Sequence, residues 1–346
     1  RLAVAGLYTL TNSRDPLVSS NNYYKLKTYS LFGSAQLSYR NYAFVNFTAR
    51  NDWSSTLPID NLSYFYPSIS ASLVLSDAFD IKSDFLTYAK IRGGWSKVGA
   101  DATPYQLINT FPFITPTFGA NPQLTAGTLD LNPNLKPETT NSSEIGAEAG
   151  FLNNRVRLDL SLYKSSSFNQ ILNVQVSNTT GYSQKLVNAG RLNNKGIEVQ
   201  LGFTPVKTTH FTWEVNANYA ANRSKLQSLD NQGLLKNYVL GSDGSIQTVA
   251  TVGQAYGSLY GTAFRRDAQG QIVVNDDGTP ATNPTNKVLG KYTPDWLGGI
   301  TNTFTYGHLS LSVLVDGSFG GRQYSSTNAT GSYTGVLAST LPGRDA

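Results

Sequence analysis

The chain has no cysteine and no methionine, and only two of its 346 residues are histidine. Without thiols it can form no disulfide, no thiolate metal site and no cysteine nucleophile. His210 and His308 stand too far apart to form a local zinc motif, and neither lies in a recognisable serine-hydrolase motif. We therefore expect no cofactor, no metal centre and no enzyme activity.

Charge is also scarce, at 14% of residues against about 25% in an average soluble domain. The net charge of +5 comes from basic residues scattered singly, so no nucleic-acid partner is expected. No stretch approaches the roughly 18 consecutive apolar residues of a membrane-crossing helix, which leaves a transmembrane barrel as the open membrane class. The start of the chain carries no initiator methionine or signal peptide, and we expect a piece of a longer polypeptide.

What the sequence has in quantity is period-two alternation, which is typical of strands with one apolar face. In 211–219 every odd position is apolar or aromatic and every even position is polar. The pattern predicts strands at 29–39, 42–53, 68–76, 86–97, 144–151, 156–163, 211–219 and 308–319, with weaker alternation in 1–10, 187–203 and 294–306. No helical period competes with it.

The predicted strands are long enough to cross a bilayer at a tilt. Their connections alternate between short ones at 40–41, 153–154, 204–210 and 307, and long ones at 54–63, 98–140, 165–186 and 223–293. Outer-membrane barrels have this asymmetry, with short periplasmic turns and long extracellular loops. The fold class is therefore predicted to be all-β, an antiparallel transmembrane β-barrel.

Aromatic residues gather near the strand ends, as in the two girdles of a membrane barrel, although aromatics also favour strands in general. If the apolar parity faces lipid, the other parity faces the lumen. This inward set comprises Asn46, Thr48, Arg50, Asp52, Lys90, Arg92, Glu144, Glu148, Arg157, Asp159, Glu198, Glu214, Asn216, Asn218 and Asp316. Its mixed charge is compatible with neutral, hydroxyl-rich or zwitterionic cargo.

Several stretches resemble one family. The segment LNPNLKPETTNSSEIGAEAGF at 131–151, followed by the hairpin LNNRVRLDLSLYK, resembles the TonB-dependent receptor signature. Others are similar to its SusC/RagA-like branch: TTGYSQKLVNAGRLNNKGIEV at 179–199, TARNDWSS at 48–55, FYPSISASLVLS at 65–76, VGQAYGSLYGTAF at 252–264, and 290–321. Together they are spread over almost the whole chain, and NAGRLNNKGIEV is the most specific.

The resemblance implies TonB-dependent import of oligosaccharides or peptides across the outer membrane, with a SusD-like surface lipoprotein as lid. It also implies a 22-stranded barrel, and we count ten or eleven strands here, about half of it. Residues 1–346 are expected to belong to the C-terminal barrel domain, while the plug domain, TonB box and final strands lie elsewhere. A dimer of transporter–lipoprotein pairs is compatible with this assignment. The alternative is a passive porin or a structural or adhesion barrel.

Candidate substrate contacts are the loop aromatics and two charged residues near the mouth. The aromatics can stack on sugar rings or pack the loops together; they are Tyr105, Phe113, Tyr182, Tyr238, Tyr256 and Tyr260. Arg50 and Asp52 can contact substrate or form a salt bridge in the wall. The acidic stretch 267–278 has some features of a calcium loop but lacks its ligand spacing and closing Glu, so a solvated turn is the simpler reading.

Overall fold

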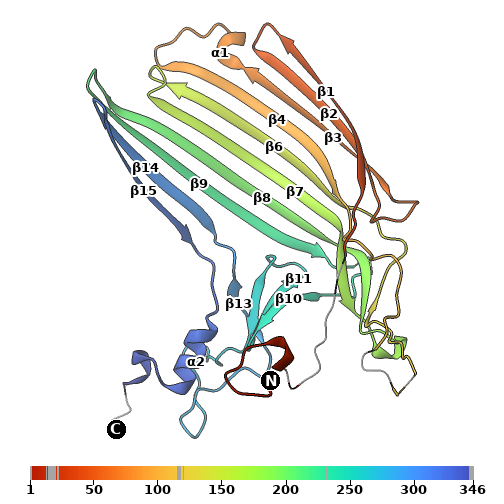
Figure 1. The fold of residues 1–346 in the computed structure, drawn as a ribbon. Helices are drawn as coiled ribbons and strands as arrows, with labels where there is room; N and C mark the ends of the chain where they lie inside the picture. Colours follow the sequence, from red (N-terminus) through yellow and green to blue (C-terminus); the bar gives the residue numbers. More distant parts are fainter. Residues whose placement is uncertain are drawn as a thin grey trace.

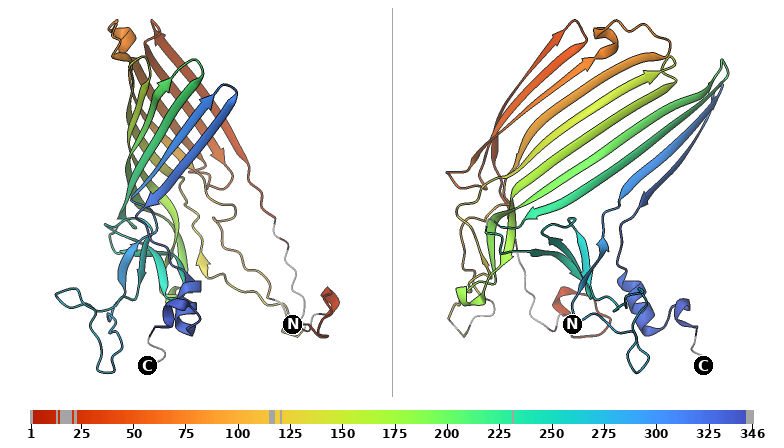
Figure 2. Two further views of the ribbon diagram at one scale, coloured as in Figure 1. Left: turned by 90° about the vertical axis from the view of Figure 1, so that its left-hand side faces the viewer. Right: turned by 180° about the vertical axis from the view of Figure 1, so that it is seen from behind.

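The computed structural model describes residues 2–12, 14, 21, 23–114, 118–119, 121–230 and 232–342. Ten antiparallel strands, each bonded to the next, form one large curved sheet that is open between β1 and β15 (Figures 1 and 2). The strands of this sheet are β1 (Thr28–Tyr39), β2 (Ala43–Ser54), β3 (Ser63–Val74), β4 (Leu86–Ala100), β6 (Glu138–Phe151), β7 (Val156–Gln175), β8 (Gln184–Lys207), β9 (Phe211–Ser228), β14 (Trp296–Tyr306) and β15 (Leu309–Phe319). The predicted all-β antiparallel architecture is confirmed, as an open part of a barrel.

Most of the smaller elements lie at one end of this sheet, and α1 (Leu75–Ala78) lies at the other (Figure 1). A second antiparallel sheet consists of β10 (Asn237–Asp243), β11 (Ile246–Thr251), β12 (Ser258–Gly261) and β13 (Lys287–Lys291), while β5 (Leu129–Asp130) pairs in parallel with β8. The helices are short: η1 (Leu10–Asn12), α1 (Leu75–Ala78), η2 (Asn178–Thr180), α2 (Ser326–Thr334) and η3 (Ala338–Thr340). Among the described residues, no helix combines the length and the apolar content that crossing a membrane requires.

The connections alternate as predicted. The turns at 40–42, 152–155, 208–210 and 307–308 and the α1 connection lie at one end, here called the turn end (Figure 1). The longer connections lie at the opposite end, the loop end. Short turns are possible because Arg40, Asn41, Asn153 and Asn154 adopt positive φ, a conformation that suits tight hairpins.

Several predicted boundaries are wrong: residues 75–76 are helical, and 138–140 and 204–207 are strand. Two further differences are larger. Most of 165–186 is strand, because the β7–β8 ladder continues from Phe168↔Arg191 to Gln175↔Gln184. The predicted loop 223–293 likewise begins as strand, since β9 runs to Ser228, and it contains the four-stranded sheet. Beyond a bilayer a polar hairpin can keep its ladder in water, so polarity alone does not end a strand.

The alternation at the N-terminus does not produce the strand it predicts. Residues 2–9 lie outside the named strands and lead into η1, while Arg1 lies outside the described residues. The side chain of Asn12 explains this, because its Nδ2 donates to the carbonyl oxygens of Val4 and Leu7 at 2.7 and 2.6 Å. Gly6 supplies the positive φ of 81° that the resulting turn requires.

The two faces of the large sheet differ as the period-two pattern predicts. One face carries the apolar parity, and large side chains stay uncovered there, such as Ile145 at 62% and Val315 at 68% exposure. This is the apolar face. The opposite, polar face carries the predicted inward set. A water-soluble sheet would bury its apolar face under a second layer, whereas the second sheet here lies at the loop end (Figure 1).

Aromatic pairs mark both ends of the apolar face. At the turn end Tyr39 and Tyr42 meet edge to face at 5.6 Å, and the Phe85 and Phe151 rings lie 5.4 Å apart. At the loop end Trp296 stacks on Phe319 at 4.4 Å. These two girdles bound the apolar band.

The buried core lies among the loops. One cluster joins Leu57, Ala102, Leu135 and Leu186, and a second joins Leu226, Leu229 and Ala250. The loop end is therefore packed around these two clusters, and we call this packed part the platform.

Candidate functional site

Two of the sequence stretches quoted above meet at the base of the platform. Leu135 of LNPNLKPE is completely buried, and its carbonyl accepts a hydrogen bond from Asn61 Nδ2 at 3.1 Å. The next residue, Lys136, is bonded through its backbone to Asn188 of NAGRLNNKGIEV. Glu138 closes the contact by accepting from the amide of Ile171 at 2.8 Å. These stretches therefore fix the long loop 101–137 to the β7–β8 hairpin.

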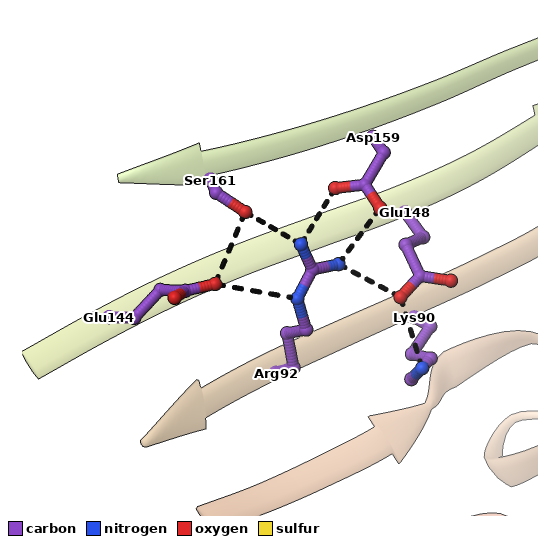
Figure 3. Close-up of polar contacts among 6 residues, drawn as sticks. All are labelled: Lys90, Arg92, Glu144, Glu148, Asp159 and Ser161. Atoms are coloured by element: carbon purple, nitrogen blue, oxygen red, sulfur yellow. Dashed lines mark hydrogen bonds and ion pairs between the residues drawn. The ribbon is translucent and has the colours of Figure 1, made fainter. Parts of the chain in front are cut away.

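The polar face carries a charge cluster centred on Arg92 of β4 (Figure 3). Its guanidinium donates from Nη1 to Glu148 at 2.8 Å and from Nη2 to Asp159 at 2.7 Å. Nη2 also donates to Ser161 Oγ at 2.6 Å, and Nε lies 3.9 Å from Glu144. Lys90 adds a 3.0 Å bond to Glu148. The predicted inward carboxylates are thus brought together, and the acidic and basic charges largely compensate one another.

Glycines on the neighbouring strands give these side chains room to cross. Arg92 passes over Gly146 of β6 to reach β7, and a Cβ on that glycine would lie 2.8 Å from the guanidinium carbon. Arg157 on β7 lies over Gly202 of β8 in the same way, with its Nε 2.9 Å from the notional Cβ. Alternation in the sequence predicts the inward parity of the charges but not the role of these glycines. The one sequence feature that pointed to that role is Gly146 in the Glu-Ile-Gly motif.

A row of small polar side chains crosses the polar face beside this cluster. Successive strand pairings align one residue from each of eight strands, and we call this set the hydroxyl row: Ser34, Thr48, Ser68, Ser96, Ser142, Ser165, Asn194 and Ser224. Thr48 and Ser68 are already bonded at 2.6 Å. A cavity of about 490 Å³ lies over the centre of the row and includes Ser96, Ser142 and Ser165 in its lining.

A second hollow of about 650 Å³ lies on the polar face nearer the turn end. Asp159, Arg157, Gln200 and Asn218 line it. Its walls therefore offer amide and charged groups, where the first cavity offers mainly hydroxyls. Both hollows are open grooves in a wall.

Arg50 and Asp52 form the ion pair that was one of the two predicted options. Arg50 Nε donates to Asp52 Oδ1 at 2.7 Å, and its Nη2 donates to Ser30 at 2.9 Å. Asp52 is only 5% exposed, and its other oxygen accepts from the Tyr66 hydroxyl. The carboxylate is thus occupied by wall residues, whereas half of the Arg50 side chain still faces open space.

The six candidate aromatics differ in burial, and four of them are either exposed or packed. Tyr105 and Phe113 are exposed, at 60% and 71%. Tyr238 and Tyr256 pack against the cluster of Leu226, and burial raises the pKa of Tyr256. Tyr105 also links two segments, because its hydroxyl accepts from the Lys25 amide at 3.1 Å and its ring lies 6.3 Å from that of Tyr24.

The remaining two candidates, Tyr182 and Tyr260, are intermediate in burial. The hydroxyl of Tyr182 accepts from Asn109 Nδ2 at 3.3 Å, and the same amide also donates to Asp130, at 3.2 Å. Lys185 lies 3.1 Å from that carboxylate and lowers its pKa. Tyr260 is half-buried in β12. These residues do not converge with Arg50 into a single pocket.

The acidic stretch 267–278 uses its carboxylates on its own backbone. Asp267 Oδ1 accepts from the amide of Gln271 at 2.8 Å, and Asp277 Oδ1 accepts from the amide of Thr279 at 2.9 Å. In the described part of the chain, no three His, Cys, Asp or Glu residues are grouped to hold a metal ion. The arrangement is that of hydrogen-bonded turns.

Comparison with known proteins gives consistent matches. The family model for the TonB dependent receptor-like beta-barrel matches residues 3–341. TonB-dependent receptor P26 of Formosa agariphila is 31% identical over 344 residues, which are 92% of this chain and 34% of that protein. TonB-dependent receptor SusC of Bacteroides thetaiotaomicron is 26% identical over 315 residues, which are 85% of this chain and 31% of that protein.

The fold is similar to a solved structure, that of the RagAB peptide transporter. The TM-score is 0.73 at 20% identity, with 90% of this chain and 36% of that chain covered. The chain spans about a third of the length of the curated relatives it matches. The family match includes the whole ten-stranded sheet, with its bare apolar face and polar wall, and the second sheet. The chain therefore belongs to the TonB-dependent receptor family, with a SusC-like sequence, and forms part of an outer-membrane β-barrel.

Proposed function

We propose that the protein imports oligosaccharides or peptides across the outer membrane, driven by TonB and assisted by a SusD-like surface lipoprotein. The observation that carries this proposal is the continuous polar wall opposite a lipid-facing band. The sequence similarity to the TonB-dependent receptor SusC and the structural similarity to the RagAB peptide transporter support it. TonB would be engaged through a segment outside this sequence.

The chemistry of the wall favours cargo without net charge. Arg92 is bonded to both Glu148 and Asp159, and Lys90 is bonded to Glu148, so two cations and two carboxylates compensate one another inside the wall. The hydroxyl row is left to offer donors and acceptors to a passing ligand. Hydroxyls and amides suit sugar hydroxyls and peptide groups, because each can both donate and accept. The platform loops, which carry Tyr105 and Phe113, would make the first contact with cargo.

The proposed import is tested with the full-length transporter and its neighbouring lipoprotein in cells with and without TonB. Uptake of labelled neutral oligosaccharides or peptides is expected only where TonB is present. Uptake that continues unchanged without TonB would identify a passive pore, and an absence of both uptake and binding would favour a structural or adhesion barrel. Co-purification with the lipoprotein tests the partnership separately.

The hydroxyl row is tested with adjacent serine pairs. Ser142→Ala with Ser165→Ala removes two hydroxyls from the polar face of β6 and β7. Ser143→Ala with Ser166→Ala makes the same chemical change on the opposite face of the same strands. The first pair is expected to slow uptake severalfold, while the second leaves it unchanged. Equal uptake by both double variants would remove the hydroxyl row from the transport path.

A further inference from the structure

Three basic residues stand side by side on the apolar face near the loop end. Lys164 of β7 pairs directly with Lys195 of β8, and Lys195 pairs with Arg223 of β9. Lys164 and Lys195 share the parity of Leu162 and Ile197, so they project from the lipid-facing side of the sheet. We call Lys164, Lys195 and Arg223 the basic row.

The basic row is electrostatically unfavourable in isolation. Directly opposed like charges destabilise a strand pair, and cross-strand neighbours lie only about 5 Å apart. All three side chains are exposed, and within the described residues none forms an ion pair. The nearby carboxylate of Asp295 interacts mainly with Lys291, to which it is bonded at 2.8 Å, and only weakly with Arg223. The row therefore lacks an anion of its own.

The position of the row is that of a membrane boundary. The same ladder runs from Trp95 through Ser143 to Lys164, so the basic row continues the loop-side aromatic girdle. On the turn-end side of the basic row lie apolar side chains such as Ile145, exposed at 62%. Girdle aromatics sit at the level of lipid headgroups, and long basic side chains there reach toward the polar region.

More cations lie just beyond the row on the same face. Lys225 stands one ladder step nearer the loops, paired with Asn193, and Arg191 stands one step further. Lys97 occupies the corresponding step on β4, paired with Asn141. The acidic residues of these strands, such as Glu198, project from the opposite face. Positive charge is therefore concentrated where the apolar band ends.

We propose that the basic row binds phosphate groups of anionic lipid headgroups in the outer leaflet. A lipid satisfies both halves of this surface, because its acyl chains cover the apolar side chains while its phosphates neutralise the adjacent cations. Two neighbouring cations can share one phosphate, and a headgroup with two phosphates can engage all three. This site is on the outside of the barrel and is independent of the cargo.

The test uses the full-length transporter in detergent micelles and measures binding of diphosphorylated lipid A by native mass spectrometry. The triple variant Lys164→Gln, Lys195→Gln, Arg223→Gln is expected to bind at least tenfold more weakly, since a cation near an anionic surface contributes roughly fivefold. Lys164→Arg with Lys195→Arg is expected to keep the wild-type affinity. The charge-matched control is Arg40→Gln, Arg155→Gln, Lys207→Gln at the turn end, expected within twofold of wild type.

Two further probes identify the ligand. Dephosphorylated lipid A is expected to bind the wild type as weakly as the diphosphorylated lipid binds the triple variant. Inorganic phosphate alone is expected not to compete at equal concentration; full competition would make this a free-anion site and overturn the proposal. Unchanged lipid affinity in the triple variant would also overturn it, as would loss of a dimer without loss of lipid binding, which would indicate a protein interface.

Discussion

Asn188 bonds the backbone of Lys136 in both directions. Its Oδ1 accepts from the Lys136 amide at 2.7 Å, and its Nδ2 donates to the Lys136 carbonyl at 2.7 Å. Nδ2 also donates to the carbonyl of Asn169 at 3.0 Å. One side chain thus joins the long loop, Asn169 of β7 and β8, directly beside the fully buried Leu135.

The substitution Asn188→Asp keeps the shape of this side chain and removes its donor. The second oxygen of the aspartate would then face the carbonyl oxygens of Lys136 and Asn169. We therefore expect the free energy of unfolding to fall by about 1–3 kcal/mol and loop 101–137 to be cleaved faster by proteases. Thermal unfolding and limited proteolysis of the full-length protein measure this. Asn178→Asp, at an exposed position of η2, is the matched control and should change neither. Equal sensitivity of the two variants would contradict the role of Asn188.

Gly146 gives a second prediction, because its missing side chain lets Arg92 reach Asp159. Gly146→Ala would push the guanidinium away from Asp159 and Ser161, and weakening these charge-assisted bonds should cost about 1–2 kcal/mol. Gly93→Ala, on β4, meets only a backbone oxygen at 3.7 Å and should be neutral or slightly stabilising. Urea-induced unfolding in micelles distinguishes them, and coinciding unfolding midpoints would mean that Arg92 simply moves aside.

Much of the fold follows from the sequence, because alternation is a local property. The odd positions of 211–219 lie on the apolar face as predicted, and Arg92, Glu148 and Asp159 share the polar face. Register is not local. Nothing near Ser96 indicates that it stands beside Ser142, so the hydroxyl row and the basic row emerge only from the strand pairings. The ladder beyond Phe168 is also not readable from the local sequence, because its polar residues resemble those of a loop.

The hydrogen bonds of Asp230 predict that the stability of the loop at residues 233–235 depends on pH. Its carboxylate accepts from the amides of Leu235 at 2.9 Å, Gly233 at 2.6 Å and Leu234 at 3.0 Å, and these bonds, that of Leu235 first, lower its pKa. Because the folded pKa lies below the unfolded value of about 3.9, the stabilisation is present above that value. It is lost as pH falls through the lower folded pKa.

Hydrogen exchange tests this loop after correction for the intrinsic rate at each pH. At neutral pH Asp230→Ala should increase exchange at residues 233–235, whereas Asp243→Ala at the exposed end of β10 should not. In the wild type the protection should disappear in strongly acidic buffer. Protection that persists there would show that packing of Leu235 against the Leu226 cluster holds the loop without the carboxylate.

The exposed and packed aromatics should separate binding from stability. Tyr105→Ala and Phe113→Ala remove exposed rings, so both should weaken cargo binding severalfold. Phe113→Ala should leave thermal stability unchanged, whereas Tyr105→Ala also removes the acceptor of the Lys25 amide and should lower stability slightly. Tyr256→Ala removes a ring from the second core cluster, so it should lower the unfolding temperature. Calorimetry on the full-length complex gives both quantities. Unchanged affinity in the first two variants would leave cargo recognition to other loop residues.

Adjacent positions on β8 test which face meets lipid. Val199 lies on the apolar face between Leu160 and Tyr219, and Gln200 lies on the polar face between Asp159 and Asn218. A lysine facing the middle of the bilayer costs about 2–4 kcal/mol, whereas one facing the aqueous interior costs little. Val199→Lys should therefore reduce folding into phospholipid vesicles, and Gln200→Lys should fold as the wild type does. If Gln200→Lys reduced folding and Val199→Lys did not, the polar wall with the charge cluster of Arg92 would face lipid. That result would contradict the assignment of the two faces.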